Sequence, residues 1–356
     1  SPRRVISLGG LLLLKRTLFV FITVALVIFA SCGCDLENHS ASSCVVMTYN
    51  VQNLFDAYVC GTEYPEFTPE QGWSTEQYKE RLRRTARAIT QEHGLIPDIV
   101  VLQEIENEQV VEDLLREHLG KRGFQWYAVS HDRETAIQTG IISRFPITAV
   151  RLHGVINQRS LLEATFHIEG EEIVLFALHG KSNLGGVEES EDKRLATAKA
   201  LASLSENLLK TNPALPIIIA GDFNQSADTF KRNNCDYQTA LVPYDVMESE
   251  AYRKAGSLIV RGSPSTQDWY TWWLDREFLL KAKAQGSYWY DGVWETFDQI
   301  LLSPAFFDNR GVEFKSGQVG ASDYLCDAKG RPQRWDIKNG TGVSDHLPVY
   351  VELAFY

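Results

Sequence analysis

Short apolar runs that end in polar side chains recur along the chain from about residue 44 onward. Runs of four to eight residues rich in Val, Ile and aromatic residues, bounded by turn residues, predict β-strands. By this criterion we expect strands at residues 45–51, 99–105, 126–130, 140–143, 161–168, 173–178, 217–220, 296–302 and 347–354. Apolar residues spaced three and four apart predict helices at about residues 75–92, 108–119 and 189–209.

Strands outnumber helices in this pattern, and several neighbouring strands are separated only by a turn, as at residues 169–172. Such short connections favour antiparallel pairing, unlike a purely βαβ chain. We therefore expect an α+β fold, an α/β sandwich of two packed mixed sheets with helices on the outside. No linker, repeat or low-complexity block interrupts residues 44–356, so one domain is the simplest organisation.

The N-terminal segment has the pattern of an export signal. Lys15 and Arg16 precede a short apolar stretch, and small residues lead up to Cys32. The apolar stretch is shorter than the ~20 residues that span a bilayer. A retained membrane helix is the alternative, but polar sequence follows at once.

The small residues before Cys32 resemble a bacterial lipoprotein cleavage site. We expect residues 1–34 to be a signal peptide of the lipoprotein type with the lipid on Cys32, and residues 35–43 to be a tether. Lipidation at Cys34, or simple cleavage and release, are the alternatives. The protein would then be exported to the cell envelope and anchored to the membrane by lipid, or be a periplasmic or extracellular protein. We also expect it to be a monomer.

Four cysteines remain beyond this segment: Cys44, Cys60, Cys235 and Cys326. An even number in an exported chain permits disulfides, and Cys44 with Cys60 is the closest pair in sequence. Buried free thiols are the alternative. The spacing of these cysteines fits no zinc pattern.

The charge of the chain is acidic. The formal net charge is −11, and loss of residues 1–34, which hold four basic residues and no acidic ones, takes it to −15. This balance argues against a protein that binds nucleic acid through general electrostatics. A bound metal ion can still receive a phosphate group locally, because the cation is then the dominant charge.

Polar residues at the ends of four expected strands point to phosphate chemistry. They are Asn50, Glu104, the pair Asp222 and Asn224, and the pair Asp345 and His346. Asp222 and Asn224 alternate along an extended segment, so their side chains point to one face. Each residue also has a plainer explanation: a solvated acid, an Asx turn or a structural histidine. If the four strand ends meet, however, their oxygens suit a hard divalent cation that helps to cut a phosphate ester.

Taken together, these motifs resemble the endonuclease/exonuclease/phosphatase superfamily, whose fold is that of DNase I-like nucleases. The resemblance covers nearly all of residues 44–356, with the motifs in the same order. It is strongest to the predicted bacterial extracellular nucleases of that superfamily, in residues 47–56, 179–183, 286–290 and 296–303. It implies a DNase I-like domain and a hydrolase.

The resemblance also implies roles for individual residues. Asn50, Glu104 and Asp345 would hold Mg²⁺, with Mn²⁺ as an alternative. Gln52 stands where some relatives have a carboxylate, so the number of metals, one or two, stays open.

The same resemblance implies that Asp298 orients His346 and raises its basicity. Either Asp222 or His346 would activate the attacking water. His179 and Asn224 would then bind phosphate oxygens or the leaving group. The further candidates for substrate binding are Lys181, Asn183 and Arg159.

Two other clusters have competing explanations. Residues 267–290 are rich in Trp and Tyr, which fits a platform for unpaired bases or contact with a membrane interface. Packing in the core is the plainer explanation and the one we expect. A basic patch on an expected helix, most simply a solvated face, is formed by Arg81, Arg83, Arg84 and Arg87.

We therefore expect an exported, Mg²⁺-dependent phosphodiesterase that cuts DNA or RNA. A hydrolase of phospholipids or of inositol or other small phosphate esters is the alternative with the same chemistry. An inactive binding protein on the cell surface is the alternative from another class.

Overall fold

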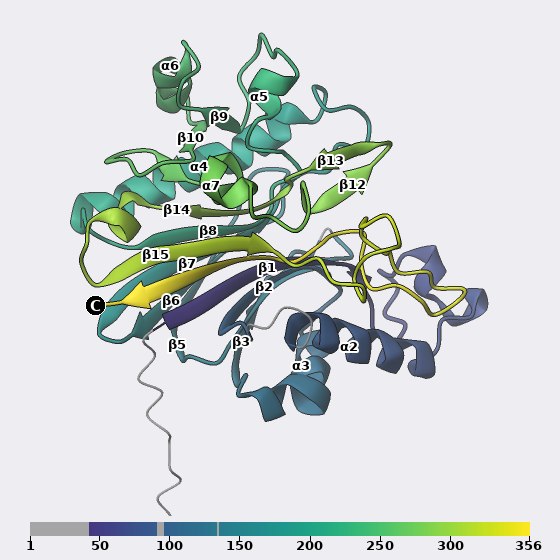
Figure 1. Cartoon of the computed structure of the whole chain (residues 1–356). Coiled ribbons are helices and arrows are strands. Elements are labelled where there is room, and N and C mark those ends of the chain that lie inside the picture. Colours follow the sequence, from purple (N-terminus) through teal and green to yellow (C-terminus); the bar gives the residue numbers. More distant parts are fainter. Residues whose placement is uncertain (1–42, 91–95, 134) are drawn as a thin grey trace, which may run out of the picture. The chain divides into compact units, whose positions relative to one another are not determined.

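The computed structural model describes residues 43–90, 96–133 and 135–356. The expected signal peptide with Cys32, and the tether up to residue 42, lie outside the described residues. In the described part, two β-sheets pack face to face with helices on their outer faces (Figure 1). The expected α+β sandwich of two mixed sheets is thus confirmed.

The first sheet, here called sheet A, has the strand order β15-β16-β1-β2-β4-β3. The bounds are β1 (Ser43–Leu54), β2 (Ile99–Ile105), β3 (Trp126–Val129), β4 (Gln138–Ser143), β15 (Val312–Val319) and β16 (Val349–Phe355). Strands β1 and β2 are parallel, and the other pairs are antiparallel. The C-terminal ends of β1 and β2 therefore lie at the same edge.

The second sheet, here called sheet B, has the strand order β5-β6-β7-β8-β14-β11-β10-β9. The bounds are β5 (Ile147–His153), β6 (Leu161–Ile168), β7 (Glu171–His179), β8 (Ile217–Asp222), β9 (Leu241–Pro243), β10 (Leu258–Arg261), β11 (Trp269–Tyr270) and β14 (Asp298–Leu302). Strands β7 and β8 are parallel, and β14 runs antiparallel to β8. A separate hairpin pairs β12 (Tyr288–Tyr290) with β13 (Val293–Glu295).

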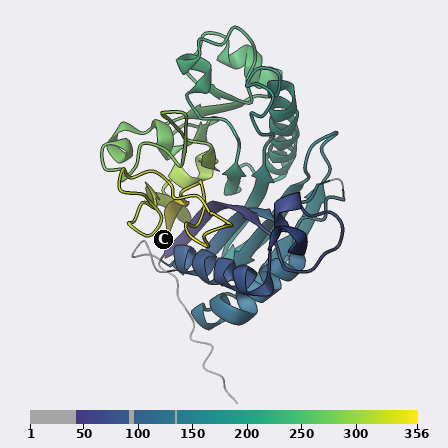
Figure 2. The ribbon, with the colours of Figure 1, turned by 90° about the vertical axis from the view of Figure 1, so that its right-hand side faces the viewer.

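Helices cover the outer faces of the two sheets. Helix α2 (Thr75–Thr90) and helix α3 (Glu108–Leu114) lie along sheet A, while α4 (Glu191–Thr211) lies along sheet B (Figures 1 and 2). The shorter helices are α5 (Thr229–Arg232), α6 (Ser249–Lys254) and α7 (Arg276–Leu279). Short η segments complete the helical part: η1 (Pro65–Phe67), η2 (Pro69–Gln71), η3 (Leu115–Leu119), η4 (Gly120–Arg122), η5 (Trp272–Leu274) and η6 (Pro304–Phe307).

Alternate residues of the central strands of sheet B enter two different apolar clusters. In β8, Ile218 and Ala220 join the cluster shared with sheet A, whereas Ile217 and Ile219 join the cluster that includes residues of α4. Side chains alternate between the faces of a strand, so both faces of this sheet are buried. This parity decides which way the polar residues at the strand ends point.

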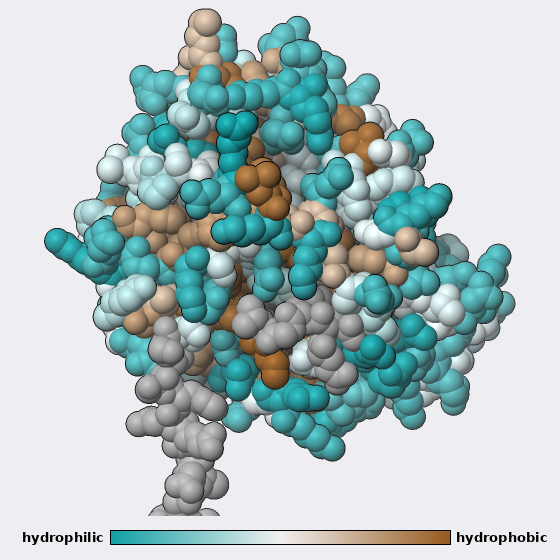
Figure 3. All heavy atoms as spheres, viewed as in Figure 1, coloured by the Kyte–Doolittle hydropathy of each residue, from teal (hydrophilic) through white to brown (hydrophobic). Residues whose placement is uncertain are grey.

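The outer surface is mostly polar. On the face that Figure 3 shows, hydrophilic residues dominate and apolar ones form small groups. Among the described residues, no helix has the length and apolar character needed to cross a membrane.

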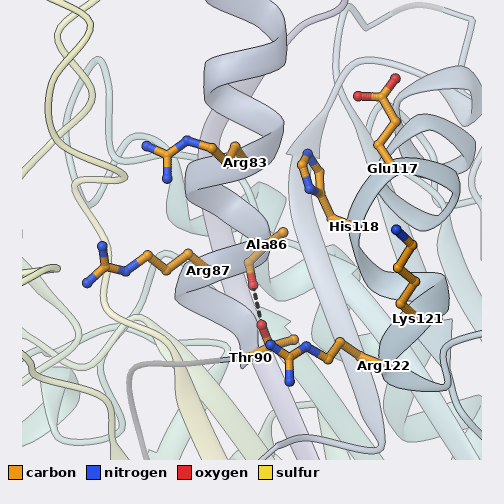
Figure 4. Close-up of a pocket in the computed structure, with 8 residues that line it drawn as sticks. All are labelled: Arg83, Ala86, Arg87, Thr90, Glu117, His118, Lys121 and Arg122. Carbon is orange, nitrogen blue, oxygen red and sulfur yellow. Dashed lines mark hydrogen bonds between the residues drawn. The ribbon is translucent and has the colours of Figure 1, made fainter.

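The basic patch on α2 is only partly solvated. Arg81 is completely buried, so the expectation of a solvated face is wrong for this residue. Arg83 and Arg87 instead line a hollow of about 430 Å³ between α2 and the segment after α3 (Figure 4). Lys121 and Arg122 line its other side. The helix therefore carries basic residues with two different roles.

Candidate active site

Three polar side chains form a row across the end of sheet B. His179 of β7 is the register neighbour of Asp222 of β8, and Asp298 of β14 is the neighbour of Asp222 on the other side. Asp222 has the same parity as Ile218 and Ala220, which face sheet A. The row therefore faces the edge of sheet A where β1 and β2 end.

Asn50 joins the two sheets. Its Nδ2 donates hydrogen bonds to Glu104 Oε1 and to Asp222 Oδ2, both at 3.0 Å. The side chain is completely buried, and its Oδ1 accepts the backbone N–H of Gln52 at 2.9 Å. Strand ends that are far apart in sequence thus meet at one place, as the sequence patterns indicate.

A β-bulge directs Glu104 into this place. The register of β2 against β4 shifts between Gln103 and Ile105, and Glu104 has a φ of 63°. Bulges re-aim a side chain in this way, and a positive φ is uncommon outside glycine. Glu104 Oε2 accepts the backbone N–H of Asn53 at 2.9 Å, which fixes the carboxylate.

The charges around Glu104 fit a divalent cation. Burial, and next the negative charge of Asp345, raise the pKa of Glu104. Asp345 is half-buried, and its Oδ2 lies 3.9 Å from Arg334 Nη2. Glu104 and Asp345 supply carboxylate oxygens with excess negative charge, which suits Mg²⁺ or Mn²⁺. Asn50 presents Nδ2 to Glu104 and uses Oδ1 to accept the N–H of Gln52, so its oxygen would reach the ion only after the amide rotates. Glu104, Asp345 and Asn50 are the residues that would hold the ion.

His346 is paired with Asp298. Its Nδ1 lies 2.7 Å from Asp298 Oδ2, and its Nε2 lies 4.0 Å from Asp222 Oδ2. Burial lowers the pKa of His346, but the charge of Asp298 and the hydrogen bond with it outweigh burial and raise the pKa to about 10. Burial acts on Asp222 in the opposite direction: it raises the pKa of this carboxyl, because burial disfavours the charged form of an acid.

His179 approaches Asp222 from the other side. Its Nε2 lies 3.7 Å from Asp222 Oδ2 and 3.9 Å from Glu104 Oε1. Burial and the positive charge of Arg159 lower the pKa of His179, so this imidazole is neutral. One oxygen of Asp222 is therefore surrounded by an amide, a neutral histidine and a protonated histidine.

Asn224 forms part of a tight turn beside this row. Its backbone N–H donates to Asp222 Oδ1 at 2.7 Å, which is the Asx turn considered as the plainer explanation. Its Nδ2 donates to Gly180 O at 3.2 Å. A Cβ on Gly180 would lie 2.5 Å from Phe223 O, so the close approach of the two segments requires glycine there.

The candidate phosphate-binding residues lie around Gly180 but differ in their contacts. Arg159 Nη1 donates to Gly180 O at 3.5 Å, and Lys181 is half-buried, which lowers its pKa. The Asn183 Oδ1 accepts from Arg194 at 2.6 Å. Asn183 thus helps to hold the loop, and its amide oxygen is already in use.

Arg81 is a positioning residue that the sequence did not indicate. Its guanidinium donates to Val343 O, to Val51 O and, at 2.9 Å, to Gln52 O. It thereby fastens the end of β1 to the loop that carries Asp345. The available signal was its place on the buried face of α2, three residues after the buried Tyr78.

Gln52 and Ser344 also tie this loop to β1. Gln52 Oε1 accepts the Trp335 N–H at 2.7 Å, and its Nε2 donates to Trp335 O at 3.4 Å. Both ends of the amide are used, so Gln52 fastens the loop and offers no free oxygen to a second metal. Ser344 Oγ donates to Asn50 O at 2.7 Å.

The aromatic stretch is divided between the core and the site. Trp269, Tyr270, Trp272 and Trp273 are buried, as core packing predicts. In β12, by contrast, the Tyr288 ring lies 4.6 Å from the His346 ring, and Tyr290 is 68% exposed. The rings of Tyr288 and Tyr290 are parallel, with centroids 6.4 Å apart.

The cysteines form no disulfide among the described residues. Cys44, Cys60, Cys235 and Cys326 are all free thiols. Cys44 is buried in sheet A, whereas Cys60 is exposed, so the closest pair in sequence does not pair in the structure.

A two-sheet sandwich with carboxylates, amides and histidines gathered at one edge defines a DNase I-like fold. The family model described as the endonuclease/exonuclease/phosphatase family matches residues 45–265 and 272–355. The chain belongs to this family, as its motifs indicate, and the known enzymes of that family are hydrolases of phosphate esters. No curated protein matches the chain in sequence.

Solved structures show the same fold at low sequence identity. A humanized D. rerio TDP2 carrying 14 mutations is 16% identical, with a TM-score of 0.53 over 88% of this chain and 99% of that one. A truncated Caenorhabditis elegans TDP2 is 15% identical, with a TM-score of 0.51 over 88% and 98%. An endonuclease/exonuclease/phosphatase family protein from Bacteroides thetaiotaomicron is 17% identical, with a TM-score of 0.50 over the same shares.

Proposed function

We propose that the protein is an exported, divalent-metal-dependent phosphodiesterase that cuts nucleic acid at unpaired nucleotides. The observation that carries the proposal is the convergence on Asp222 Oδ2 of Asn50, His179 and His346, at 3.0, 3.7 and 4.0 Å. A carboxylate, two imidazoles and an amide are thereby gathered around one oxygen, which is the set of groups that phosphate ester hydrolysis uses for proton transfer and charge stabilisation. Family membership supports the reaction class, and the substrate is our inference.

The pKa directions suggest a division of labour between the two candidate bases. Burial raises the pKa of Asp222 towards neutrality, which is where a general base works best. His346 is held protonated by Asp298, so it donates a hydrogen bond to the phosphate oxygen on which charge develops. Asp222 then accepts the proton of the attacking water.

The other residues bind and orient the phosphate. Neutral His179 donates one N–H to a non-bridging oxygen or to the leaving group, while Lys181 and Arg159 supply positive charge beside Gly180. Glu104, Asp345 and, after rotation of its amide, Asn50 would hold a divalent cation, which would neutralise the phosphate charge. Asn183 is not assigned to the substrate, because its oxygen is bonded to Arg194.

The hairpin of β12 and β13 supports the choice of substrate. Tyr288 and Tyr290 form an aromatic ledge that begins against His346 and ends in solvent. Bases that are not paired stack on such rings without sequence preference. D. rerio TDP2, which shares the fold, has been crystallised with a single-strand DNA product; that structure is 16% identical with a TM-score of 0.50 over 88% of this chain and 99% of that one.

The test is a substrate panel with matched variants. Single-stranded DNA, duplex DNA, RNA, sphingomyelin vesicles and a phosphomonoester are incubated with Mg²⁺ or with EDTA. We expect Mg²⁺-dependent cleavage of single strands above duplex, a loss of this preference in Tyr290→Ala, and loss of all turnover in His346→Gln. Turnover of sphingomyelin or of the monoester without DNA or RNA cleavage would favour the alternative substrates. Absence of any turnover would favour a binding protein.

Export and lipid anchoring complete the proposal. Their support is the signal-like segment of residues 1–34 with Cys32, which lies outside the described residues. Expression of the full chain in a bacterial host tests them: the wild type is expected in the membrane fraction, and Cys32→Ser in the soluble periplasmic or secreted fraction. Membrane association of Cys32→Ser would contradict anchoring at this residue.

A further inference from the structure

A second group of metal-ligand side chains lies outside the candidate active site. One ligand atom each of Cys60, Glu63 and Glu106 lies within 4.8 Å of the other two. Cys60 and Glu63 belong to the loop between β1 and η1, and Glu106 directly follows β2. The spacing of cysteines along the sequence gave no sign of this group, because it holds one cysteine and two glutamates from separate segments of the chain.

Glu106 is the member that points most directly to a ligand. Its side chain is buried, with 4% of the residue exposed. Its Oε2 accepts the backbone N–H of Asp56 at 2.7 Å, but its Oε1 has no hydrogen-bond partner among the described residues. Buried carboxylate oxygens without a partner are rare, because such a group loses its hydration and gains nothing in return.

The neighbouring carboxylate adds negative charge to the same place. Both oxygens of Glu63 accept backbone N–H groups, those of Cys60 and Gly61, which fixes the carboxylate and leaves further lone pairs for a ligand. Neither Glu63 nor Glu106 forms an ion pair with a basic side chain of the described residues. Two carboxylates this close repel each other unless a cation lies between them or one of them is protonated.

We propose that Cys60, Glu63 and Glu106 bind one divalent transition-metal ion, with Zn²⁺ as the ion that fits best. Zn²⁺ accepts thiolate sulfur together with carboxylate oxygen and is often held by three protein ligands and a water. Mg²⁺ prefers oxygen alone, so the thiol separates this site from the oxygen-only donor set at Glu104. On binding, the Cys60 Sγ–H bond breaks, its proton goes to solvent, and the thiolate forms the bond to the metal.

The bound ion would fasten the loop after β1 to the end of β2. Glu106 is two residues beyond Glu104, and Asp56, which bonds to Glu106, is three residues beyond Asn53, which bonds to Glu104. The bound ion would cross-link two segments of the chain, so its occupancy is expected to raise the unfolding temperature of the domain. This metal site is independent of which phosphate ester the protein cuts.

The experiment starts from reduced protein from which all metal has been removed. Mg²⁺ is then added to saturate the candidate active site. Zn²⁺ binding is measured by calorimetry, and Co²⁺ is added as a probe whose near-ultraviolet absorption reports a thiolate ligand. The variants are Cys60→Ser and Glu106→Gln, and Cys326→Ser is the matched cysteine control. We expect a thiolate band and Zn²⁺-induced thermal stabilisation in the wild type and in Cys326→Ser, loss of both in Cys60→Ser, and about 10-fold or more weaker Zn²⁺ binding in Glu106→Gln.

Two results would overturn the proposal. One is a wild-type protein without a Co²⁺–thiolate band. The other is a band or a Zn²⁺-induced stabilisation that survives Cys60→Ser. Because Cys60 is exposed, the serine variant is expected to fold, and its circular dichroism without metal verifies this.

Discussion

The two sheets contribute to the candidate active site by the same geometry but with different chemistry. In each sheet a parallel pair of strands, β1 with β2 and β7 with β8, ends at the site. Sheet A supplies Asn50 and Glu104, whose oxygens are fixed by amide and backbone N–H groups. Sheet B supplies a buried row of titratable groups centred on Asp222.

This difference separates holding a cation from moving a proton. Fixed oxygen donors with excess negative charge suit a metal ion, whereas buried acids and imidazoles with shifted pKa values suit proton transfer. Because Asn50 donates to both Glu104 and Asp222, the halves are in direct contact. Variants of the two halves should nevertheless respond differently to added metal.

Asp222→Asn should have the largest effect. The amide keeps an oxygen that can accept from Asn50 but cannot take a proton from water, so we expect kcat to fall by about 10²–10⁴-fold. Added Mg²⁺ should not restore the activity. Steady-state kinetics on the preferred substrate over a Mg²⁺ series measure both points, and rescue by metal would place Asp222 with the cation ligands instead.

Glu104→Gln should behave in the opposite way towards metal. Loss of one carboxylate weakens the site for the cation, so the Mg²⁺ concentration for half-maximal activity should rise by about 10–100-fold. At saturating Mg²⁺ much of the wild-type kcat should return. The same Mg²⁺ series provides the measurement, and a kcat deficit that no metal concentration relieves would remove the distinction between the sheets.

Arg81→Leu tests the support behind sheet A. The substitution leaves three carbonyl oxygens at Val51, Gln52 and Val343 without their donor, which should cost about 1–3 kcal/mol of unfolding free energy. The half-maximal Mg²⁺ concentration should also rise, because the loop carrying Asp345 is released. Urea unfolding and the Mg²⁺ series are the measurements.

Arg83→Leu is the matched control on the same helix. Arg83 is exposed and pairs with Glu80 at 2.7 Å, so its loss should change stability by less than about 0.5 kcal/mol. For Arg81 itself, a return of the half-maximal Mg²⁺ concentration to the wild-type value in Arg81→Lys would support its role in positioning the metal ligands. An unchanged half-maximal Mg²⁺ concentration in Arg81→Leu would mean that the residue contributes to stability alone.

The sequence predicted the long buried strands better than the very short or the largely exposed ones. Residues 99–105 and 161–168 were predicted with the bounds that β2 and β6 have, because each is a short, mainly apolar segment bounded by turn residues. Strands β9, β10, β11, β12 and β13 were not predicted, and each has only two to four residues. Two longer strands, β5 and β15, were also not predicted. Both are partly exposed and rich in polar or charged residues, and their pairing with β6 and β16 determines their structure.

The site residues could be named from the sequence, but their arrangement could not. Each of Asn50, Glu104 and Asp222 follows an apolar run, which local patterns show. The bulge at Glu104 and the bridge from Asn50 to Asp222 depend on contacts across 54 and 172 residues, which no local pattern contains. Arg81 was misjudged for the same reason, since the carbonyls that make its burial tolerable come from β1 and from the loop before His346.

The smallest expected effect concerns the pH dependence of the pair formed by Asp298 and His346. The folded-state pKa of His346, about 10, lies above the value of about 6.5 in an unfolded chain. The pair therefore stabilises the fold fully below about pH 6.5 and loses this contribution as the pH rises towards 10. In metal-free protein, the stability deficit of Asp298→Asn relative to wild type should shrink from pH 6 to pH 9, as measured by urea unfolding.

Asp327→Asn supplies the control for this pH series. The hydrogen bond with Arg331 lowers the pKa of Asp327 to about 2, so the contribution of this carboxylate is lost only as the pH falls below about 4. Its deficit should be flat between pH 6 and pH 9, because Asp327 stays ionised throughout. A deficit of Asp298→Asn that is equally flat, or that grows with pH, would mean that His346 is neutral in the folded protein. The proton-transfer half of the site would then rest on Asp222 and His179 alone.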